Sequence, residues 1–422
     1  MFEVLKSSWA LLLGMLMLML GNGLQSSLLG VRGGEAGFSA FQLSVVMSSY
    51  FAGFLLASRM TPELIRRVGH VRVFAALGSF ISAVLILYPA FPNPIVWAIG
   101  RVIIGFCFCG VYVTAESWLN NSASNENRGQ ALSLYMIVQM VGIIAAQAML
   151  LIPDTSGFFL FVLGSVLVSV AFAPILLSIS PTPAFETTKR MSLAQLFRTS
   201  PLGCVGMFLL GGVYAAQFGM SAVYGTAAGL SLQQISMFVA AFYVGALVLQ
   251  YPLGFLSDRM DRRRLITIVA FLGGASAVFA VAFSANFVVL LVSAFLIGGM
   301  ANPLYSLLIA YTNDFLGHED MASASAGMLF INGLGAITGP LIIGWVMDTV
   351  GPQGFFILIA VLLLLLTAYG LWRMTRRPAP TVDETGRFAP ISQASSPVFM
   401  EVAQEYAIEA AESADQPKDT AA

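Results

Sequence analysis

Two charged residues stand inside long apolar stretches of the sequence, where an uncompensated charge is costly. Arg101 belongs to the segment Gly100–Gly105, and Glu116 begins the segment Glu116–Asn120. An arginine in such surroundings could bind an anionic group or tune a nearby proton carrier. A carboxylate there could take up and release a proton, provided that it is desolvated enough to be protonated near neutral pH.

A structural interpretation competes with the chemical one at both positions. The Arg101 side chain could reach toward the outer interface of a membrane or bond to helix ends. Glu116 could instead form an ion pair that holds one end of the protein closed. Its candidate partners flank nearby apolar stretches: Arg66, Arg67, Arg72 and Arg128. We therefore treat Glu116 and Arg128 as candidates for coupling or gating, and Arg101 as a candidate for binding.

Uncharged polar side chains recur within the same apolar stretches. Together with Arg101 they form the candidate set for a binding cavity: Asn22, Gln25, Tyr112, Gln139, Tyr214, Gln217, Asn302, Tyr305 and Asn332. Alternatively, these groups hydrogen-bond neighbouring helices to one another, at about 1 kcal/mol each. We expect two further tyrosines, Tyr50 and Tyr243, to be packing or interface residues.

The sequence carries no motif of the common enzyme classes. It has no phosphate-binding P-loop, no G-x-S-x-G elbow and no H-E-x-x-H pair. Cys107, Cys109 and Cys204 all lie in apolar stretches, so we expect packing residues rather than disulfides or metal ligands. We expect no enzymatic activity, no cofactor, no metal and no nucleic-acid partner.

The elements that position these residues are membrane helices. The 422 residues are 58% hydrophobic and only 10% charged, with a mean hydropathy of +0.85, whereas soluble domains are about 25% charged. This composition predicts an all-α membrane protein, with the lipid bilayer as its solvent. A span needs about 20 apolar residues, which predicts twelve transmembrane helices near 8–31, 41–60, 72–90, 94–119, 129–152, 157–178, 200–224, 232–253, 265–284, 287–312, 322–347 and 352–374.

A short polar stretch, residues 254–264, separates two of these helices. It holds Asp258, Asp261 and four arginines, Arg259 and 262–264, so the chain must turn there in water. Arginine-rich short loops face the cytoplasm. With both termini inside, eighteen of the twenty basic residues are cytoplasmic, which predicts a multi-pass protein of the cytoplasmic (inner) membrane.

The sequence also repeats itself at a nearly constant shift. Displacement by 192 positions superposes Gly37 on Gly229 and Ser39 on Ser231, and displacement by 193 superposes Gly105 on Gly298. Further pairs at these shifts are Gln25 with Gln217, Gln42 with Gln234, Ser44 with Ser236, Gly53 with Gly245, Tyr112 with Tyr305 and Gly142 with Gly335. The repeat predicts two pseudo-symmetric six-helix bundles.

Domain boundaries follow from the repeat and from charge. We expect an N-terminal six-helix half at 1–178, a cytoplasmic linker at 179–199 and a C-terminal six-helix half at 200–376. A short surface helix is expected within the linker at Met191–Arg198. From Pro378 the chain holds eight acidic and two basic residues. We expect this acidic cytoplasmic tail, 377–422, to be disordered and dispensable for transport.

The polar stretch at 254–264 resembles the signature loop of the major facilitator superfamily, which lies between the second and third helix of a six-helix half. Gly254, Leu256, Ser257, Asp258, Arg259, Arg262 and Arg263 match it, and Asp261 replaces the usual glycine. The resemblance implies secondary transport, gating roles for Asp258, Arg259 and Arg262, and a cavity lined by the first, fourth, seventh and tenth helices.

The Glu-Ser-Trp-Leu segment at Glu116 resembles a bacterial branch of this superfamily, the YcaD-like transporters, and the resemblance covers residues 1–376. The sequence departs from the superfamily pattern in two places. The first-half counterpart of the signature loop has Arg66 where the family has aspartate, so we place the stronger carboxylate of the gate at Asp258. The fifth-helix Gly-Pro pair of drug:proton antiporters is absent, and Ala146-Gln147 stands there.

Taken together, these features predict a secondary active transporter that moves a small organic solute by alternating access. The mostly neutral and aromatic cavity set favours a neutral or weakly charged substrate, and coupling to protons rests on Glu116 and Arg101. We expect a monomer in a bacterial inner membrane. The alternative is a non-transporting membrane sensor or scaffold whose acidic tail binds a cytoplasmic partner.

Overall fold

The computed structural model describes residues 2–122, 128–153, 157–177, 191–376 and Ile391. Within these residues every regular element is a helix. The first group is α1 (Phe2–Glu35), α2 (Ala40–Val68), α3 (His70–Ala90), α4 (Pro94–Ser122), α5 (Arg128–Met149) and α6 (Phe159–Leu177). The second is α7 (Leu193–Thr199), α8 (Pro201–Ala215), η1 (Ala216–Met220), α9 (Ser221–Ala227), α10 (Leu232–Ser257), α11 (Arg262–Ala282), α12 (Phe287–Asn313), α13 (His318–Val350) and α14 (Gly354–Met374).

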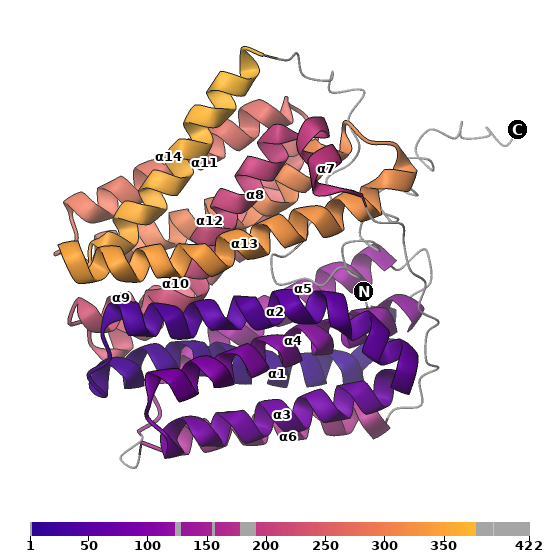
Figure 1. Ribbon diagram of the computed structural model, residues 1–422, viewed down its shortest axis with the longest axis vertical. Coiled ribbons are helices and arrows are strands. Elements are labelled where there is room, and N and C mark those ends of the chain that lie inside the picture. The colour runs from indigo at the N-terminus through magenta and orange to yellow at the C-terminus, as the bar shows by residue number, and fades with distance from the viewer. Residues whose placement is uncertain (1, 123–127, 154–156, 178–190, 377–390, 392–422) are drawn as a thin grey trace, which may run out of the picture.

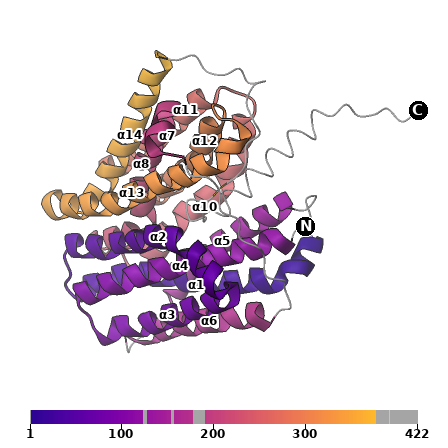
Figure 2. The same ribbon diagram turned by 45° about the vertical axis from the view of Figure 1, so that its right-hand side comes forward.

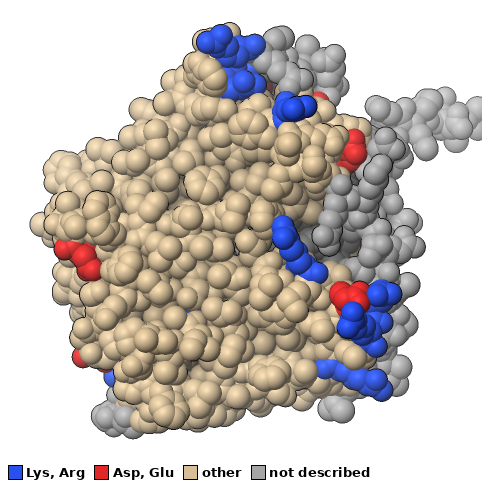
Figure 3. All heavy atoms as spheres, viewed as in Figure 1, with Lys and Arg blue, Asp and Glu red and all other residues tan. Residues whose placement is uncertain are grey.

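Eleven spans in the described part of the chain are long and apolar enough to cross a membrane. The sixth predicted span, α6, has a shorter apolar segment, Phe159–Pro174. Large apolar side chains cover the outside, including Ile95, which is 71% exposed, and Val288, which is 65% exposed. Figure 3 shows a wide surface without charged residues, with charged groups at its top, its right-hand side and its left-hand edge. An all-helical membrane protein is therefore confirmed.

In the views of Figures 1 and 2, α1 to α6 lie on one side of the molecule and α11 to α14 on the other. Helix α2 packs against α4 on its own side and against α13 across the molecule. Helix α10 packs against α12 on its own side and against α5 across the molecule. The main contacts between the two sides are α2–α13, α1–α9 and α5–α10, of which α2–α13 is the most extensive.

The start of α2 and the start of α10 have the same local structure. Gly37 and Gly229 adopt φ values of 79° and 72°, a left-handed conformation that glycine tolerates without steric cost. Two residues later, Ser39 and Ser231 cap the helices with capping boxes, which satisfy otherwise unpaired backbone N–H groups. The residue pairs that match at a shift of 192 thus build equivalent helix starts.

Glycines set the close approach of α2 to α4 and of α10 to α12. A Cβ at Gly105 would clash with the backbone carbonyl of Tyr50, and one at Gly53 with that of Val102. The matching glycines of the second repeat, Gly245 and Gly298, face backbone carbonyls in the same way. Small residues let membrane helices pack backbone against backbone, so the repeated glycines serve the same packing in both places.

The seventh predicted span, 200–224, is not one regular helix. Its α-helical part α8 ends at Ala215, a five-residue π-helix η1 follows, and α9 continues to Ala227. A π-helical segment is rare and occurs often at functional sites. The candidate residue Gln217 lies in this segment.

The predicted linker helix is present as α7, Leu193–Thr199, and residues 178–190 lie outside the described part. Of the predicted acidic tail, 377–422, the structure describes Ile391, whose side chain is 2% exposed.

Candidate functional site

A small cavity lies between α2, α8 and α13. It has room for about 30 Å³, the scale of one water molecule. Its lining is mostly aromatic and aliphatic with a few polar groups: Tyr50, Phe51, Phe54, Leu55, Ser58, Tyr214, Leu329, Asn332, Gly333 and Ala336. Two predicted binding residues, Tyr214 and Asn332, therefore face the same space. Tyr50, expected to be a packing residue, lines it as well.

Arg101 lies behind this cavity and is 0% exposed. Its guanidinium carbon is 4.7 Å from the centre of the Tyr50 ring, a cation–π contact, and its Nη2 is 3.7 Å from the sulfur of Met47. Its Nε and Nη1 atoms have no hydrogen-bond partner among the described residues. The interpretation that Arg101 extends to the membrane interface is wrong, because the side chain is directed into the protein.

A polar cluster joins α1 to α4. The Asn22 amide donates a hydrogen bond to the Tyr112 hydroxyl at 3.1 Å, and the Gln25 amide donates to Asn22 Oδ1 at 3.2 Å. All three side chains are buried. The structure thus brings together three of the predicted binding residues. Their mutual hydrogen bonds also serve helix packing, as the structural alternative proposed.

The second repeat holds a related pair. The Asn302 amide in α12 donates to Gln217 Oε1 in η1 at 3.1 Å. Gln217 matches Gln25 in the repeat, so each side has a buried glutamine bonded to an asparagine. Tyr305, the counterpart of Tyr112, is buried in α12. The Asn332 amide donates to the Met207 carbonyl at 3.0 Å, which fixes α13 against α8 beside the cavity.

Glu116 is buried near the end of α4, where its carboxylate accepts a hydrogen bond from the Tyr135 hydroxyl at 3.1 Å. Gln139, one turn further along α5, is also buried, and its Nε2 has no hydrogen-bond partner in the described chain.

Two arginines that were candidate partners of Glu116, Arg66 and Arg67, instead pair with Glu63, at 2.9 and 2.7 Å. Arg128 starts α5, but its side chain lies outside the described part.

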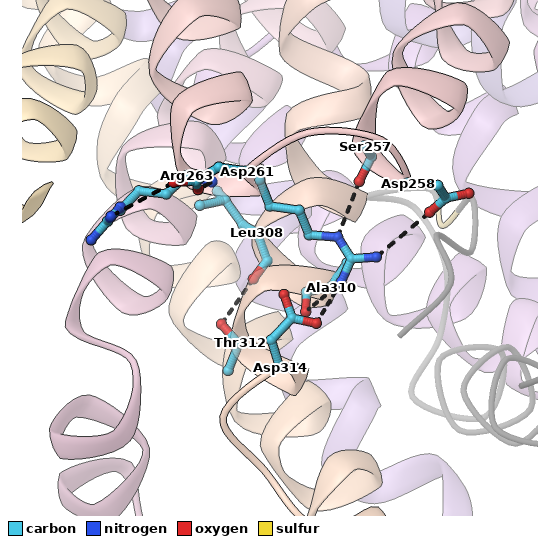
Figure 4. A network of polar contacts seen from close by, with 9 residues as sticks. Ser257, Asp258, Asp261, Arg263, Leu308, Ala310, Thr312 and Asp314 are labelled. Carbon is cyan, nitrogen blue, oxygen red and sulfur yellow. Dashed lines mark hydrogen bonds and ion pairs between the residues drawn. The ribbon is translucent and has the colours of Figure 1, made fainter. Parts of the chain in front are cut away.

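Arg262 is the centre of a charge network at the α10–α11 turn (Figure 4). Its buried guanidinium pairs with Asp314 at the end of α12 and donates to Ser257 Oγ at 3.1 Å. Asp258 lies 3.6 Å from the same guanidinium. The Asp258 side chain is 40% exposed and that of Asp314 3% exposed. Asp314 is therefore the desolvated partner of Arg262, and the expectation that the gate has its stronger carboxylate at Asp258 stays a prediction.

The other charges of this turn have separate roles. Arg259 is exposed and lies over the Phe255 ring, 3.5 Å from its centre, so it does not join the Arg262 network. Asp261 caps α11, since its carboxylate accepts from the backbone N–H of Arg263 at 2.9 Å. This cap explains why aspartate replaces glycine here. We call the end of the molecule that carries this turn the arginine-rich end.

A larger cavity of about 480 Å³ separates α5 from α10 toward the arginine-rich end. Its lining is methionine-rich and mostly apolar: Ser133, Met136, Ile137, Met140, Leu247, Gln250, Tyr251, Gly254, Phe255 and Asp258. The first half of α5 and the last half of α10 form its walls. Methionine side chains suit apolar ligands of variable shape, because they are flexible and polarizable.

At the opposite end, the same two sides of the molecule are in contact. The Asp348 carboxylate in α13 accepts hydrogen bonds from the backbone N–H groups of Ala40 and Phe41, both at 3.1 Å. A carboxylate at a helix N-terminus is favourable because the helix dipole is positive there. Ser236 in α10 donates to the Gln147 carbonyl in α5 at 2.7 Å. Sequence reasoning missed Asp348, which lies far from α2 in the chain.

Among the described residues, no group of three or more His, Cys, Asp or Glu side chains gathers where it could hold a metal ion.

The sequence matches the family model of the Major Facilitator Superfamily at residues 11–233 and 202–408. The chain belongs to this superfamily of membrane transporters, so it is a transporter and not an enzyme. It is 25% identical over 366 residues to the "Uncharacterized MFS-type transporter YcaD" of Salmonella paratyphi A, with 85% of this chain and 94% of the relative covered. The same protein from Salmonella arizonae is 25% identical over 354 residues, with 83% and 91% covered. The predicted resemblance to the YcaD-like branch is confirmed.

Two solved structures share the fold. A point mutant of the nucleoside transporter NupG superposes with a TM-score of 0.71 at 15% identity and covers 86% of this chain and 99% of its own. A bacterial homolog of the human lysosomal transporter Spinster, in an inward-facing and unoccupied conformation, has a TM-score of 0.65 at 14% identity, with 96% and 98% covered. At these identities the likeness concerns the fold.

Proposed function

We propose that the protein is a secondary active transporter of the bacterial inner membrane that moves a small organic solute by alternating access. In this proposal α6 is the twelfth span, and the chain forms two six-helix halves, 1–178 and 200–376, joined by the linker 179–199. Equivalent helix starts at Ser39 and Ser231 support the duplication. The arginines of the α10–α11 turn support a cytoplasmic position for the arginine-rich end.

The observation that carries the proposal is the difference between the two ends of the molecule. Asp348 and Ser236 join the two sides at one end, whereas a 480 Å³ cavity separates α5 from α10 at the other. A protein in which α5 and α10 are joined at one end and separated by a cavity at the other has the geometry of one state of a rocking cycle. With the arginine-rich end inside, this is the inward-open state.

The cavity linings favour a neutral or weakly charged solute with apolar surface. The small cavity offers aromatic faces and the Asn332 amide, and the large one offers methionine and aliphatic side chains. Arg101 contacts the Tyr50 ring, which lines the small cavity. Binding of a strongly anionic solute would require several such cations, since each charge must be compensated away from water.

Proton coupling would use Glu116, which the Tyr135 hydroxyl orients. A buried carboxylate that protonates during the cycle makes the transport rate depend on pH. In Glu116→Gln the charge is removed while the shape is kept, so a carrier role predicts flux that no longer responds to pH. Retained pH dependence with altered rates would assign Glu116 to gating instead.

The purified full-length protein in proteoliposomes tests the proposal. A thermal-shift screen against neutral metabolites and antibiotics finds ligands, because a ligand stabilises the state that binds it. Each ligand found is then assayed for uptake or counterflow, with Asn332→Ala and Tyr214→Phe as cavity variants and the exposed Ser79→Ala on α3 as control. Flux that is lost in Asn332→Ala and kept in Ser79→Ala supports transport. If every ligand stabilises the protein against thermal unfolding but none is transported, the sensor alternative is supported.

A further inference from the structure

Arg101 is a buried cation that has no carboxylate partner among the described residues. Its side chain is 0% exposed, and the titratable groups of the described chain that interact with it electrostatically are the phenols of Tyr88 and Tyr50. Phenols carry no charge near neutral pH, whereas an arginine stays protonated in proteins. A full positive charge therefore lies away from water, where charges need a counter-ion.

The unpaired polar groups around this charge are hydrogen-bond donors. Nε and Nη1 of Arg101 have no partner in the described part of the chain, and Nη2 lies 3.7 Å from the sulfur of Met47, a weak acceptor. The Tyr88 hydroxyl is also unpaired there, and its side chain is 1% exposed. Buried polar groups are rarely left unpaired. Two N–H groups and one hydroxyl beside a cation form a donor set that suits an anion.

The ends of two packed helices hold these donors together. Tyr88 lies near the end of α3, and the Trp97 indole N–H in α4 donates to its carbonyl at 2.9 Å. Arg101 follows one turn after Trp97. A Cβ on Gly100, the residue before Arg101, would come within 2.8 Å of Tyr88 Cε1 and 3.2 Å of Cζ. The Tyr88 phenol therefore packs directly on α4 beside Arg101.

This pair lies toward the end of the molecule where Asp348 contacts α2, which we call the sealed end. The Trp97 ring is 5.0 Å from that of Phe38, in the turn before α2. Neither of the two cavities described above has Arg101 or Tyr88 in its lining. The Tyr50 ring covers the guanidinium, 4.7 Å from its carbon. These surroundings favour a monatomic anion over a solute that brings a carbon skeleton with it.

We propose that Arg101 and Tyr88 bind a chloride ion between α3 and α4, near the sealed end. The ion accepts hydrogen bonds from the guanidinium and from the Tyr88 hydroxyl, and it compensates the buried charge. Hydrogen bonds between charged groups are stronger than those between neutral ones. The site goes beyond the proposed transport function and does not depend on it, because it is a counter-ion site separate from the small cavity at Tyr214 and Asn332.

The melting temperature of the purified full-length protein tests the site without any transported solute. Chloride is titrated against gluconate at constant ionic strength. It should raise the melting temperature saturably by about 2–4 °C, because an ion that binds the folded state stabilises it. Bromide should replace chloride, whereas acetate should have no effect. The absence of a saturable rise, or an equal rise with acetate, would overturn the proposal and leave the proposed function untouched.

Three variants assign the chloride effect to this site. Arg101→Gln removes the cation that needs the anion, so its melting temperature should not respond to chloride. Tyr88→Phe removes one hydrogen bond to the ion, so the chloride concentration for half-maximal stabilisation should rise about tenfold. Arg198→Gln, at an exposed position on α7, is the matched control and should respond like the parent.

A parent-like chloride response in Arg101→Gln would show that the ion binds elsewhere. If Arg101→Gln does not fold, Tyr88→Phe decides, and an unchanged half-maximal concentration would then rule out the site. Crystals of the protein soaked in bromide locate the ion directly. An anomalous peak should lie in contact with the Arg101 guanidinium. Peaks confined to surface arginines would be adventitious ions only and would contradict the proposal.

Discussion

At the scale of single residues, two buried arginines have opposite surroundings. Arg262 is paired with the buried Asp314 and with the Ser257 hydroxyl. Arg101 has an aromatic ring and a methionine sulfur beside it, and two of its nitrogens have no partner among the described residues. A structural arginine is expected to resemble the first, whereas an incompletely satisfied one in a membrane protein indicates function.

This contrast predicts opposite outcomes for the same substitution. Arg262→Gln leaves Asp314 buried without its cation, which should cost about 3–5 kcal/mol of stability. Arg101→Gln removes a charge that is poorly compensated, so the melting temperature should stay the same or rise while transport falls. Thermal unfolding and flux of the two variants, measured side by side, check this. A large loss of stability in Arg101→Gln would make Arg101 a structural residue.

The Asp348 carboxylate makes a second residue-scale prediction. It caps α2 from α13, so it joins the two sides at the sealed end. Asp348→Asn removes the charge that interacts with the helix dipole, worth about 0.3–1 kcal/mol and up to about 2 when partly buried. Ser44 is buried in α2 under Gly344 of α13, so a cysteine there is accessible only when the two sides separate at that end. The sealed end should open more often in Asp348→Asn, and maleimide labelling of Ser44→Cys, in a background without the native cysteines, should rise several-fold.

Glu35→Gln is the matched control for Asp348→Asn. Glu35 also lies at the sealed end, but its ion pair with Arg32, at 2.9 Å, stays within α1. The control should label at the parent rate. Equal labelling of both variants would show that Asp348 does not seal the two sides.

At the scale of elements, glycine contacts decide which helices approach closely. Gly105→Ala and Gly298→Ala would push a methyl group against the carbonyls of Tyr50 and Phe242. We expect each to destabilise the protein by roughly 1–3 kcal/mol, because backbone cannot move aside easily in a packed interface. Thermal unfolding in detergent measures the effect.

Gly164→Ala is the control for this prediction. A Cβ at Gly164 in α6 meets its nearest atom, in Leu85, at 3.8 Å, which is an ordinary contact. Helix propensity should then dominate, and the substitution should be neutral or stabilising by about 0.5–1 kcal/mol. If Gly105→Ala behaves like Gly164→Ala, the close approach of α2 to α4 is not required.

At the scale of the whole molecule, the arginines orient the chain in the membrane. A fusion of green fluorescent protein after Met260, in the arginine-rich turn, should fluoresce, because short arginine-rich turns are expected to face the cytoplasm. A fusion of alkaline phosphatase after Ala285, between α11 and α12, should be active, because the enzyme folds outside the cytoplasm. A fusion at Met260 that does not fluoresce and a fusion at Ala285 that is inactive would show the opposite topology. The proposed inward-open state would then be outward-open.

Much of this protein follows from local properties of the chain. Apolar length and low charge predict a bundle of membrane helices, and eleven of the twelve predicted spans meet the length and hydropathy expected of one. The shift of 192 pairs Ser39 with Ser231, and in the structure both residues begin helices with the same capping box. The turn at Asp258–Arg263 indicates the superfamily, which the comparisons confirm. The division into two halves stays a prediction.

The pairings across the molecule depend on the tertiary structure. Asp314 replaces Asp258 as the buried partner of Arg262, Tyr50 lies under Arg101, and Ile391 binds Ser306. None of these contacts has a signal in the sequence, because a membrane helix is apolar on nearly every face and its pattern does not show which face is turned inward. Composition alone determined that the chain is a membrane protein, and its charges predict which end faces the cytoplasm. Which polar groups meet depends on how each helix is rotated and shifted relative to its neighbours, and only the tertiary packing determines this.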